Sequence, residues 1–393
     1  RELAGTTTVA VALPNANEDD VNAIAEGALL GAYAYNAYRT KDAKAAVQKL
    51  EVLSAGARSE RAKVAIKRAE VVAEAVHGAR DLVNTPPNVL YPETFVEAAR
   101  SAVKDSGAKN IAITVLDEKA LISGGFGGIA GVGQGSDRPP RLVKLAYTPA
   151  GATQHVGLVG KGITYDSGGI SLKPGSSLHT MTLDMAGAAA VLQTIVAAAR
   201  LAVPVAVTGY LCLAENMPGG HAMRPDDVLT MRSGTTVEVT NTDAEGRLVM
   251  ADGIAEAVND GVDIVLDIAT LTGAQMIALG SRVSAVMGDD DIRSGVVDAA
   301  KACGEEFWPM PLTPDTKAGL KSKIADLLNT PSTRYGGMLA AGWFLEAFRG
   351  ETPWAHLDIA GPAYNEGAAF GYTPQLATGV GVRTLLTYLE SLA

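Results

Sequence analysis

The sequence is poor in cysteine and histidine, the side chains that most often build disulfide frameworks and transition-metal sites. Two cysteines occur in 393 residues, Cys212 and Cys303, and they lie far apart. A disulfide framework is therefore not indicated, and reduced thiols in a cytoplasmic protein are expected. The five histidines follow no metal-binding spacing, so we assign none of them to a metal. They are His77, His155, His179, His221 and His356.

Long apolar runs and an excess of positive charge are also missing. The apolar runs fall short of a bilayer-spanning helix, and the alanine-rich runs carry charges, so no membrane association is expected. The 43 acidic and 33 basic residues give a net charge of −10. This balance argues against a general affinity for nucleic acid and leaves a local basic patch open. The 47% hydrophobic content suffices for one large domain and a smaller one.

The most informative segment that is present is Asn-Thr-Asp-Ala-Glu-Gly-Arg-Leu at 241–248. Successive side chains of extended backbone alternate sides, so Asp243, Glu245 and Arg247 are expected to project to one face. β-branched residues precede the segment and helical apolar spacing follows it over 248–258, which predicts a strand-to-helix crossover. Ligands usually bind at such crossovers in open α/β sheets. An isolated Asp-x-Glu is far more often a solvated turn, so this interpretation depends on a second segment.

That second segment, 160–174, follows an apolar run that is typical of a buried strand. Its glycines allow the backbone to turn sharply and to approach another group closely. Lys161, Asp166 and Lys173 are expected to lie in this turn, and Asp184 follows a little further on.

If the strands bring both segments together, four carboxylates and one amine form a cluster. Carboxylates packed that closely repel one another strongly unless cations are bound. Oxygen-rich ligand sets suit Mg²⁺ or Mn²⁺, and Zn²⁺ also accepts carboxylates and a neutral amine. Lys161 can bind a metal only after losing its proton, and a neighbouring dication would lower its pKa. The candidate ligands are Lys161, Asp166, Asp184, Asp243 and Glu245.

Such a cluster supports hydrolysis. Two cations bridged by carboxylates would hold a water between them, lower its pKa and clamp the carbonyl oxygen of a substrate, and peptide hydrolysis is the natural use. Lys173 lies a short loop away and could polarise the same carbonyl group.

With these residues in place, the chain resembles the M17 leucyl aminopeptidases, cytosolic exopeptidases that use two metal ions. The signature at 241–248 is unbroken and highly specific, and the resemblance covers nearly everything from about residue 58 to the end. Further matching segments are 84–88, 133–136, 214–217, 270–274 and 354–361.

The resemblance implies that the five candidate ligands hold two Mn²⁺ or Zn²⁺ ions, with Mg²⁺ as a third candidate. It implies that Asp166 and Glu245 bridge the ions. Lys161 and Asp184 would complete the tighter site, and Asp243 would belong to the more exchangeable one.

The resemblance also assigns the catalytic side chains, Lys173 and Arg247, and implies that Arg247 holds a bicarbonate acting as general base. The implied activity removes an N-terminal residue, preferably Leu or another apolar residue, from short peptides with a free N-terminus. A cytoplasmic homohexamer is implied as well. The family's pocket for the N-terminal side chain matches Met181, Thr270, Leu271 and Gly273, which we would otherwise interpret as core residues.

Two other functions stay open: a DNA-binding or regulatory protein on the same fold, and a catalytically inactive relative. The acidic balance weakens the first alternative. An inactive relative is expected to have lost at least one of the charged site residues. All of them are intact here, which counts against this alternative: Lys161, Lys173, Asp184 and Arg247.

A few positions outside the candidate site have open interpretations. Gln375-Leu376 stands where the family usually has Lys-Gly, a change that would affect packing near the rim of the site or between subunits. His356 is interpreted as a hydrogen-bonded structural residue. For Asp267 and Asp358, a satisfied buried carboxylate and a partner that supports the site are equally good interpretations.

The order of segments predicts an α/β fold with three parts. A large C-terminal domain over 84–393 has a mixed sheet flanked by helices on both faces. A connecting helix over 58–83 precedes it, because an apolar stripe recurs there at helical spacing until Asn84-Thr85-Pro86-Pro87. Residues 1–57 are expected to form a smaller, partial N-terminal α/β domain, and the start at Arg1 leads us to expect a longer polypeptide. Strands are expected at 6–13, 111–115, 142–147, 155–159, 205–213, 262–268 and 356–359.

Overall fold

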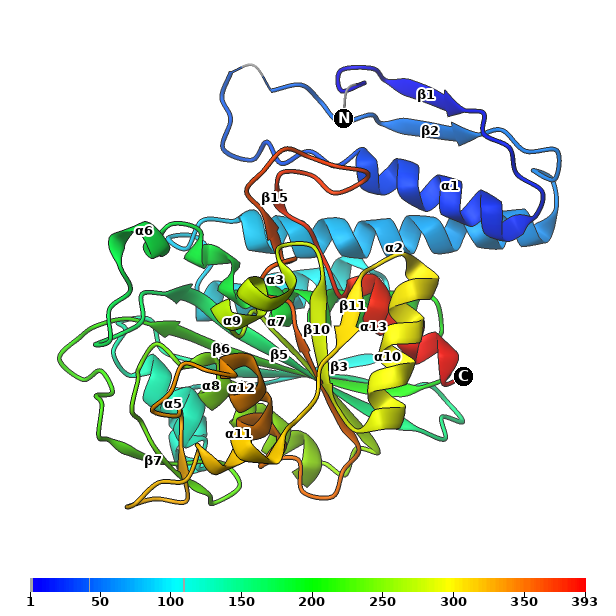
Figure 1. The fold of residues 1–393 in the computed structure, drawn as a ribbon. Helices are drawn as coiled ribbons and strands as arrows, with labels where there is room; N and C mark the ends of the chain where they lie inside the picture. The colour runs from blue at the N-terminus through cyan, green and yellow to red at the C-terminus, as the bar shows by residue number, and fades with distance from the viewer. Residues whose placement is uncertain (1–2, 42, 109) are drawn as a thin grey trace.

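An eight-stranded mixed sheet lies at the centre of the computed structural model, which describes residues 3–41, 43–108 and 110–393 (Figure 1). Four neighbouring strands of this sheet, β13, β9, β5 and β6, run parallel, while β10 and β4 on either side of them run antiparallel. In spatial order the strands are β11 (Phe307–Pro309), β10 (Ser284–Gly288), β13 (Trp354–Asp358), β9 (Ile264–Ala269), β5 (His155–Asp166), β6 (Ala206–Asn216), β4 (Arg141–Tyr147) and β3 (Ile111–Leu116).

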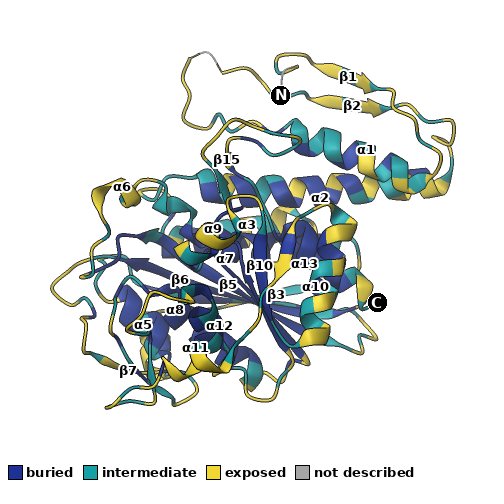
Figure 2. Ribbon diagram, in the orientation of Figure 1, coloured by how far each residue is buried: buried dark blue, intermediate teal, exposed yellow. Residues whose placement is uncertain are grey.

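Helices cover both faces of this sheet, so the predicted fold class is confirmed (Figure 2). Successive side chains of the central strand enter opposite cores: Leu158 packs in one hydrophobic cluster and Val159 in the other. One face is covered by α2 (Glu60–Asn84), α3 (Pro92–Asp105), α7 (Ala186–Arg200), α10 (Asp290–Cys303) and α13 (Val382–Ser391). The other face is covered by α4 (Glu118–Ser123), α5 (Gly127–Gly133), α8 (Gly246–Asn259) and α12 (Gly337–Glu346).

The N-terminal segment forms a separate layer above α2 (Figure 1). Its strands β1 (Thr8–Val11) and β2 (Lys49–Val52) pair in parallel, and α1 (Glu18–Gly31) packs between them and α2. The Asn17 side chain accepts a hydrogen bond from Asp20 N at 2.9 Å, as expected for an N-cap. Residues 1, 2 and 42 of the predicted N-terminal region lie outside the described residues.

Shorter elements lie outside the main sheet and the helices that cover it. A three-stranded sheet and a two-stranded hairpin are present, together with four short helical segments. They are β7 (Val228–Thr230), β8 (Thr236–Glu238), β12 (Leu327–Leu328), β14 (Tyr364–Asn365), β15 (Leu376–Ala377), α6 (Gly175–Leu178), η1 (Met181–Met185), α9 (Gly273–Leu279) and α11 (Pro314–Ala318).

Three expectations from the sequence were wrong in detail. β5 continues to Asp166, so Lys161 and Asp166 lie on a strand and only Lys173 lies in the following loop. The segment around Glu245 is not extended, because Glu245 itself has helical dihedral angles (φ −77°, ψ −35°) and α8 begins at the next residue. The helical stretch Met181–Arg200 is long and apolar enough to cross a membrane, but 89% of it is buried inside the fold, as expected for a core helix.

Leu376 is a non-glycine residue that adopts a left-handed backbone conformation with φ +76°. It opens β15 opposite Asn365, and its side chain is partly exposed. Left-handed backbone costs a non-glycine residue roughly 1–2 kcal/mol. We therefore expect Leu376→Gly to be more stable than Leu376→Ala by about 1 kcal/mol, the reverse of the usual order. Urea unfolding of both variants measures this, and an alanine variant of equal or greater stability would contradict it.

Candidate metal centre and active site

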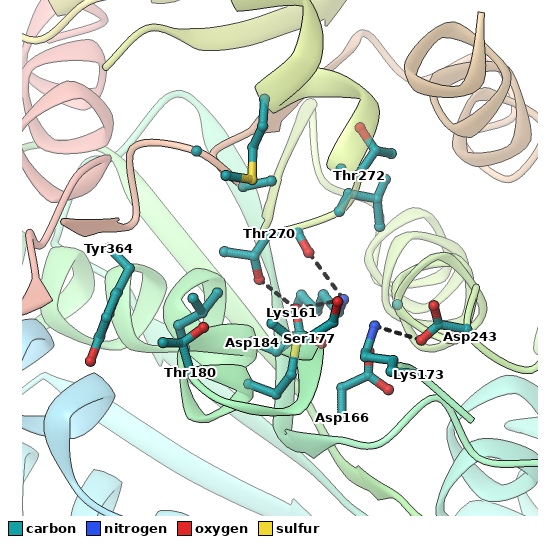
Figure 3. Close-up of a pocket in the computed structure, with 18 of the residues that line it drawn as sticks. Lys161, Asp166, Lys173, Ser177, Thr180, Asp184, Asp243, Thr270, Thr272 and Tyr364 are labelled. Atoms are coloured by element: carbon teal, nitrogen blue, oxygen red, sulfur yellow. Dashed lines mark hydrogen bonds and ion pairs between the residues drawn. The ribbon is translucent and has the colours of Figure 1, made fainter. Parts of the chain in front are cut away.

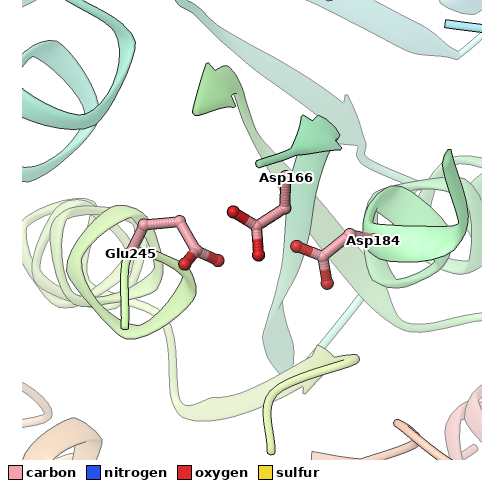
Figure 4. A group of neighbouring side chains, drawn as sticks. All are labelled: Asp166, Asp184 and Glu245. Atoms are coloured by element: carbon pink, nitrogen blue, oxygen red, sulfur yellow. The ribbon is translucent and has the colours of Figure 1, made fainter. Parts of the chain in front are cut away.

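Three carboxylates from three different elements converge at the carboxyl end of β5 (Figure 4). Asp166 ends β5, Asp184 lies in η1, and Glu245 caps α8. One oxygen from each lies within 4.8 Å of the others, and all three residues are buried. The parallel neighbours of β5 place the loops that carry these groups at one edge of the sheet, where ligands bind in such folds.

Lys161 lies beneath this cluster and makes two ion pairs with it. Its Nζ is 2.8 Å from Asp184 Oδ1 and 2.9 Å from Glu245 Oε1, and it donates a hydrogen bond to Thr270 O at 3.1 Å. A Cβ on Gly246 would lie 2.5 Å from that Nζ, so a larger residue at this position would displace the lysine side chain from its place beside α8.

Lys173 and Asp243 complete the charged cluster from the solvent side (Figure 3). Lys173 Nζ lies 2.8 Å from Asp166 Oδ2 and 2.5 Å from Asp243 Oδ1. Asn216 on β6 orients Asp166 through a hydrogen bond of 2.8 Å from Nδ2 to Oδ1, and the same Nδ2 donates to Thr242 O. The two charged segments of the sequence are therefore brought together as predicted.

The electrostatics of the cluster favour added positive charge. Burial and the neighbouring Glu245 raise the pKa of Asp166 to about 6. Burial, Glu245 and Asp166 also raise the pKa of Asp184, although Lys161 opposes them. Asp184 Oδ2 and Glu245 Oε2 are buried and have no hydrogen-bond partner within the described chain. Buried acceptors of this kind are costly unless a ligand satisfies them, so this oxygen-rich site fits divalent cations.

Lys161 is protonated in the absence of metal. Burial alone would lower its pKa, but Asp184 and Glu245 outweigh burial and raise it above its ordinary value. A neutral amine at this position therefore requires a dication that compensates for the two carboxylates.

Arg247 lies in the first turn of α8 and is buried beside the cluster. Its Nη1 donates to Asn329 O at 2.8 Å, and its Nε has no hydrogen-bond partner within the described residues. Burial lowers its pKa to about 10, so it remains a cation at neutral pH. An unpaired buried guanidinium N–H is suited to an anion or to a polar group of a ligand.

Asn329 is a supporting residue that sequence reasoning missed. It is fully buried at the end of β12. Its Oδ1 accepts from Thr240 N at 2.7 Å, and its Nδ2 donates to Asn241 O at 2.7 Å. It therefore holds the start of the 241–248 segment with its side chain and Arg247 with its main-chain carbonyl. A single asparagine carries no spacing signal that could have identified it.

A cavity of about 450 Å³ opens onto the charged cluster (Figure 3). Every one of the eleven predicted site residues lines it, and so does His179, to which no role was assigned. Thr270 also donates to Asp184 Oδ1 at 2.8 Å. The eleven are Lys161, Asp166, Lys173, Met181, Asp184, Asp243, Glu245, Arg247, Thr270, Leu271 and Gly273.

Three of the residues with open interpretations, Asp267, His356 and Asp358, lie on β9 and β13. His356 Nδ1 is 2.5 Å from Asp267 Oδ1, and Trp354 Nε1 donates to the other oxygen of Asp267 at 2.6 Å, so this carboxylate is satisfied within the core. Asp358 instead accepts from Leu271 N and from Thr272 Oγ1 at 3.1 and 2.7 Å. Asp358 therefore supports the loop that lines the cavity.

Comparison with known proteins identifies the family to which this chain belongs. A model of the catalytic domain of the cytosol aminopeptidase family matches residues 77–386, more than three quarters of the chain. The chain belongs to this family. The family resemblance found in the sequence is thereby confirmed.

Relatives in the cytosol aminopeptidase family match along nearly the whole chain. A probable cytosol aminopeptidase of Clavibacter michiganensis subsp. michiganensis is 54% identical over 401 residues, covering 98% of this chain and 79% of the relative. One from Streptomyces avermitilis is 54% identical over 400 residues, covering 100% and 77%. Among solved structures, the bottromycin maturation enzyme BotP in complex with Mn has a TM-score of 0.92 and 40% identity, covering 100% of this chain and 85% of that chain.

Membership in the cytosol aminopeptidase family sets the reaction class. Its members are hydrolases that depend on divalent metals and release residues from peptide N-termini, so this chain is a metal-dependent aminopeptidase. The buried acidic cluster described above is consistent with that dependence.

Proposed function

We propose that this aminopeptidase holds two divalent metal ions and removes Leu or another apolar residue from the N-terminus of short peptides. The observation that carries the proposal is the convergence of Asp166, Asp184 and Glu245, with two buried oxygens unpartnered, at the floor of a cavity that is partly apolar. Mn²⁺ and Zn²⁺ are the preferred ions, and Mg²⁺ is a third candidate.

Five side chains would hold these ions: Lys161, Asp166, Asp184, Asp243 and Glu245. When bound, the two metal ions would supply Lewis-acid chemistry that acidifies a water molecule and polarises the substrate carbonyl. Thr270 and Asn216 fix the orientations of Asp184 and Asp166 through the hydrogen bonds described above.

The two remaining charged groups act on the reacting peptide bond. Lys173 is on the solvent side of the cluster and donates to the carbonyl oxygen as negative charge develops there. Arg247 remains a cation at neutral pH and has a free Nε, and in this proposal it holds a bicarbonate that serves as general base. Varying bicarbonate at constant pH tests this role, because turnover that is unchanged across concentrations would remove it.

Specificity in the proposal follows from the walls of the cavity. The substrate's free α-amine would lie at the metal-binding carboxylates, and an acyl group on it would remove the lone pair that a metal ion could accept. Its side chain lies against Met181, Leu271 and Gly273, with Met276 beside them, a surface that suits apolar groups of the size of Leu.

We also propose a cytoplasmic homohexamer as the working assembly. The free thiols of Cys212 and Cys303 support the location, and so do the relatives that are named cytosol aminopeptidases. The exposed apolar side chains of Ile277 and Trp308 are consistent with burial against other subunits. Light scattering would give a mass six times that of the chain, and any other multiple would contradict the hexamer.

Hydrolysis of Leu-p-nitroanilide and of its N-acetylated analogue tests the proposed function. Both are measured after chelation and again after addition of Mn²⁺, Zn²⁺ or Mg²⁺. Metal-restored cleavage of the unblocked substrate alone is the expected result. Equal cleavage of both substrates, or cleavage that survives chelation, would contradict it.

Asn329 offers a test of how Arg247 is positioned. We expect Asn329→Ala to lower kcat about tenfold with little change in KM, because the side chain that ties Asn329 to Thr240 and Asn241 is lost and the main-chain carbonyl that accepts from Arg247 is no longer held in place. In an Arg247→Ala background the same substitution is expected to cost nothing further, since the two residues act as a unit. Losses that multiply in the double variant would show that Asn329 acts on something other than Arg247.

A further inference from the structure

A second cavity, of about 320 Å³, borders the same metal-binding segment. Asn241 and Arg247 contribute to its wall, and the remainder comes from loop 330–337, which connects β12 to α12 and carries Arg334. Arg247 lines both cavities, so the second cavity adjoins the candidate active site at this residue.

The chemistry of the second cavity is opposite to that of the first. Two arginines line it, together with the hydroxyl groups of Ser332 and Thr333, and no carboxylate is found among the lining residues of the described chain. Arg247 is only 7% exposed and its Nε is unpartnered, whereas Arg334 is exposed and accessible from solvent. Guanidinium groups bind carboxylates through paired N–H donors, so this cavity suits an organic carboxylate.

The two cavities adjoin along one short stretch of chain. Asn241 lines the second cavity and Asp243 lines the first, and two residues separate their Cα atoms by at most about 7.6 Å. An extended peptide advances about 3.3–3.6 Å per residue. A dipeptide or tripeptide whose α-amine lies at the metal cluster is therefore long enough to extend past Asp243 toward the second cavity.

We propose that this cavity binds the C-terminal carboxylate of dipeptide and tripeptide substrates, with Arg334 as the residue that recognises it. This inference rests on the proposed aminopeptidase function and adds a second point of recognition to it. The amine end of such a peptide then lies at the acidic, metal-binding site and its carboxylate end lies in the basic cavity. Longer chains cannot place their terminal carboxylate there, so this arrangement favours short peptides.

The test compares Leu-Gly with Leu-Gly-amide, which differ only in the terminal carboxylate. We expect kcat/KM of the wild-type protein to be at least about tenfold higher for the free acid, the order of one charge-assisted hydrogen bond. Arg334→Gln is expected to bring the ratio close to one while leaving hydrolysis of Leu-p-nitroanilide unchanged. Arg224→Gln is the matched control, because Arg224 is an exposed arginine that lines neither cavity.

Several outcomes overturn the inference. A wild-type ratio near one does so, and so does an Arg334→Gln variant that keeps the wild-type ratio. If Leu-p-nitroanilide is not hydrolysed at all, the proposed function is what fails. Calorimetric binding of Leu-Gly then tests the carboxylate site alone, and binding that is equal in wild-type protein and Arg334→Gln would overturn it.

Discussion

Asp184→Ala is expected to lose metal from the tighter site and to lower turnover by at least about 10² at limiting metal. Asp184 supplies one of three converging carboxylates, and its Oδ2 is a buried oxygen without a partner. Removing it leaves the Nζ of Lys161 with one carboxylate in place of two, which lowers the pKa of this lysine, so the expected loss of metal is caused by the missing oxygen ligand. Metal content by plasma emission spectrometry and turnover across a metal titration measure both effects.

Asp184→Asn provides the matched control, because it keeps the shape and one oxygen and loses the charge. We expect it to bind metal with an affinity between those of the wild-type protein and the alanine variant. Circular dichroism shows whether each variant is folded. A folded Asp184→Ala protein that retains full metal occupancy at limiting metal would show that the assignment of Asp184 as a ligand is wrong.

The charged residues of the site could be predicted from the sequence because they lie next to segments with clear periodicity. β5, β6 and β9 are apolar runs buried on both faces, and such runs are recognisable without a structure. Asp166 ends β5 and Thr270 directly follows β9, so the predicted strands place both residues at the carboxyl edge of the sheet. The sequence does not predict which strands are neighbours. The pairing of β5 with both β6 and β9 is what brings the loops together.

Other features depended on interactions that leave no pattern in the sequence. Asp243, Glu245 and Arg247 were expected to share one face of an extended segment, but α8 begins at Gly246 and turns the segment before Arg247. At that start Gly246 packs against the side chain of Lys161, a contact between residues that lie far apart in the chain. β10 (Ser284–Gly288) was not predicted at all, because five residues ending in glycine give no clear alternation.

Lys173→Ala is expected to lower kcat by about 10² to 10³ while metal content stays at the wild-type level. A positioned donor to a developing oxyanion is worth roughly 3 kcal/mol of barrier, which corresponds to that range. In the metal-free protein Lys173 Nζ pairs with Asp166 and Asp243, and bound cations would neutralise these carboxylates and leave the ammonium group to the substrate. KM is expected to change little, because the donor acts mainly on charge that develops after binding.

Comparison with Asp184→Ala separates the two roles by their response to metal. Excess Mn²⁺ is expected to restore much of the activity of Asp184→Ala, because that variant is limited by affinity for the ion. The same excess is expected to leave Lys173→Ala unchanged, because its defect lies in the stabilisation of the transition state. Lys173→Arg keeps a cation in a bulkier group and is expected to recover part of the turnover. If added metal rescued Lys173→Ala instead, this lysine would be part of the metal-binding apparatus, and another donor would have to stabilise the oxyanion.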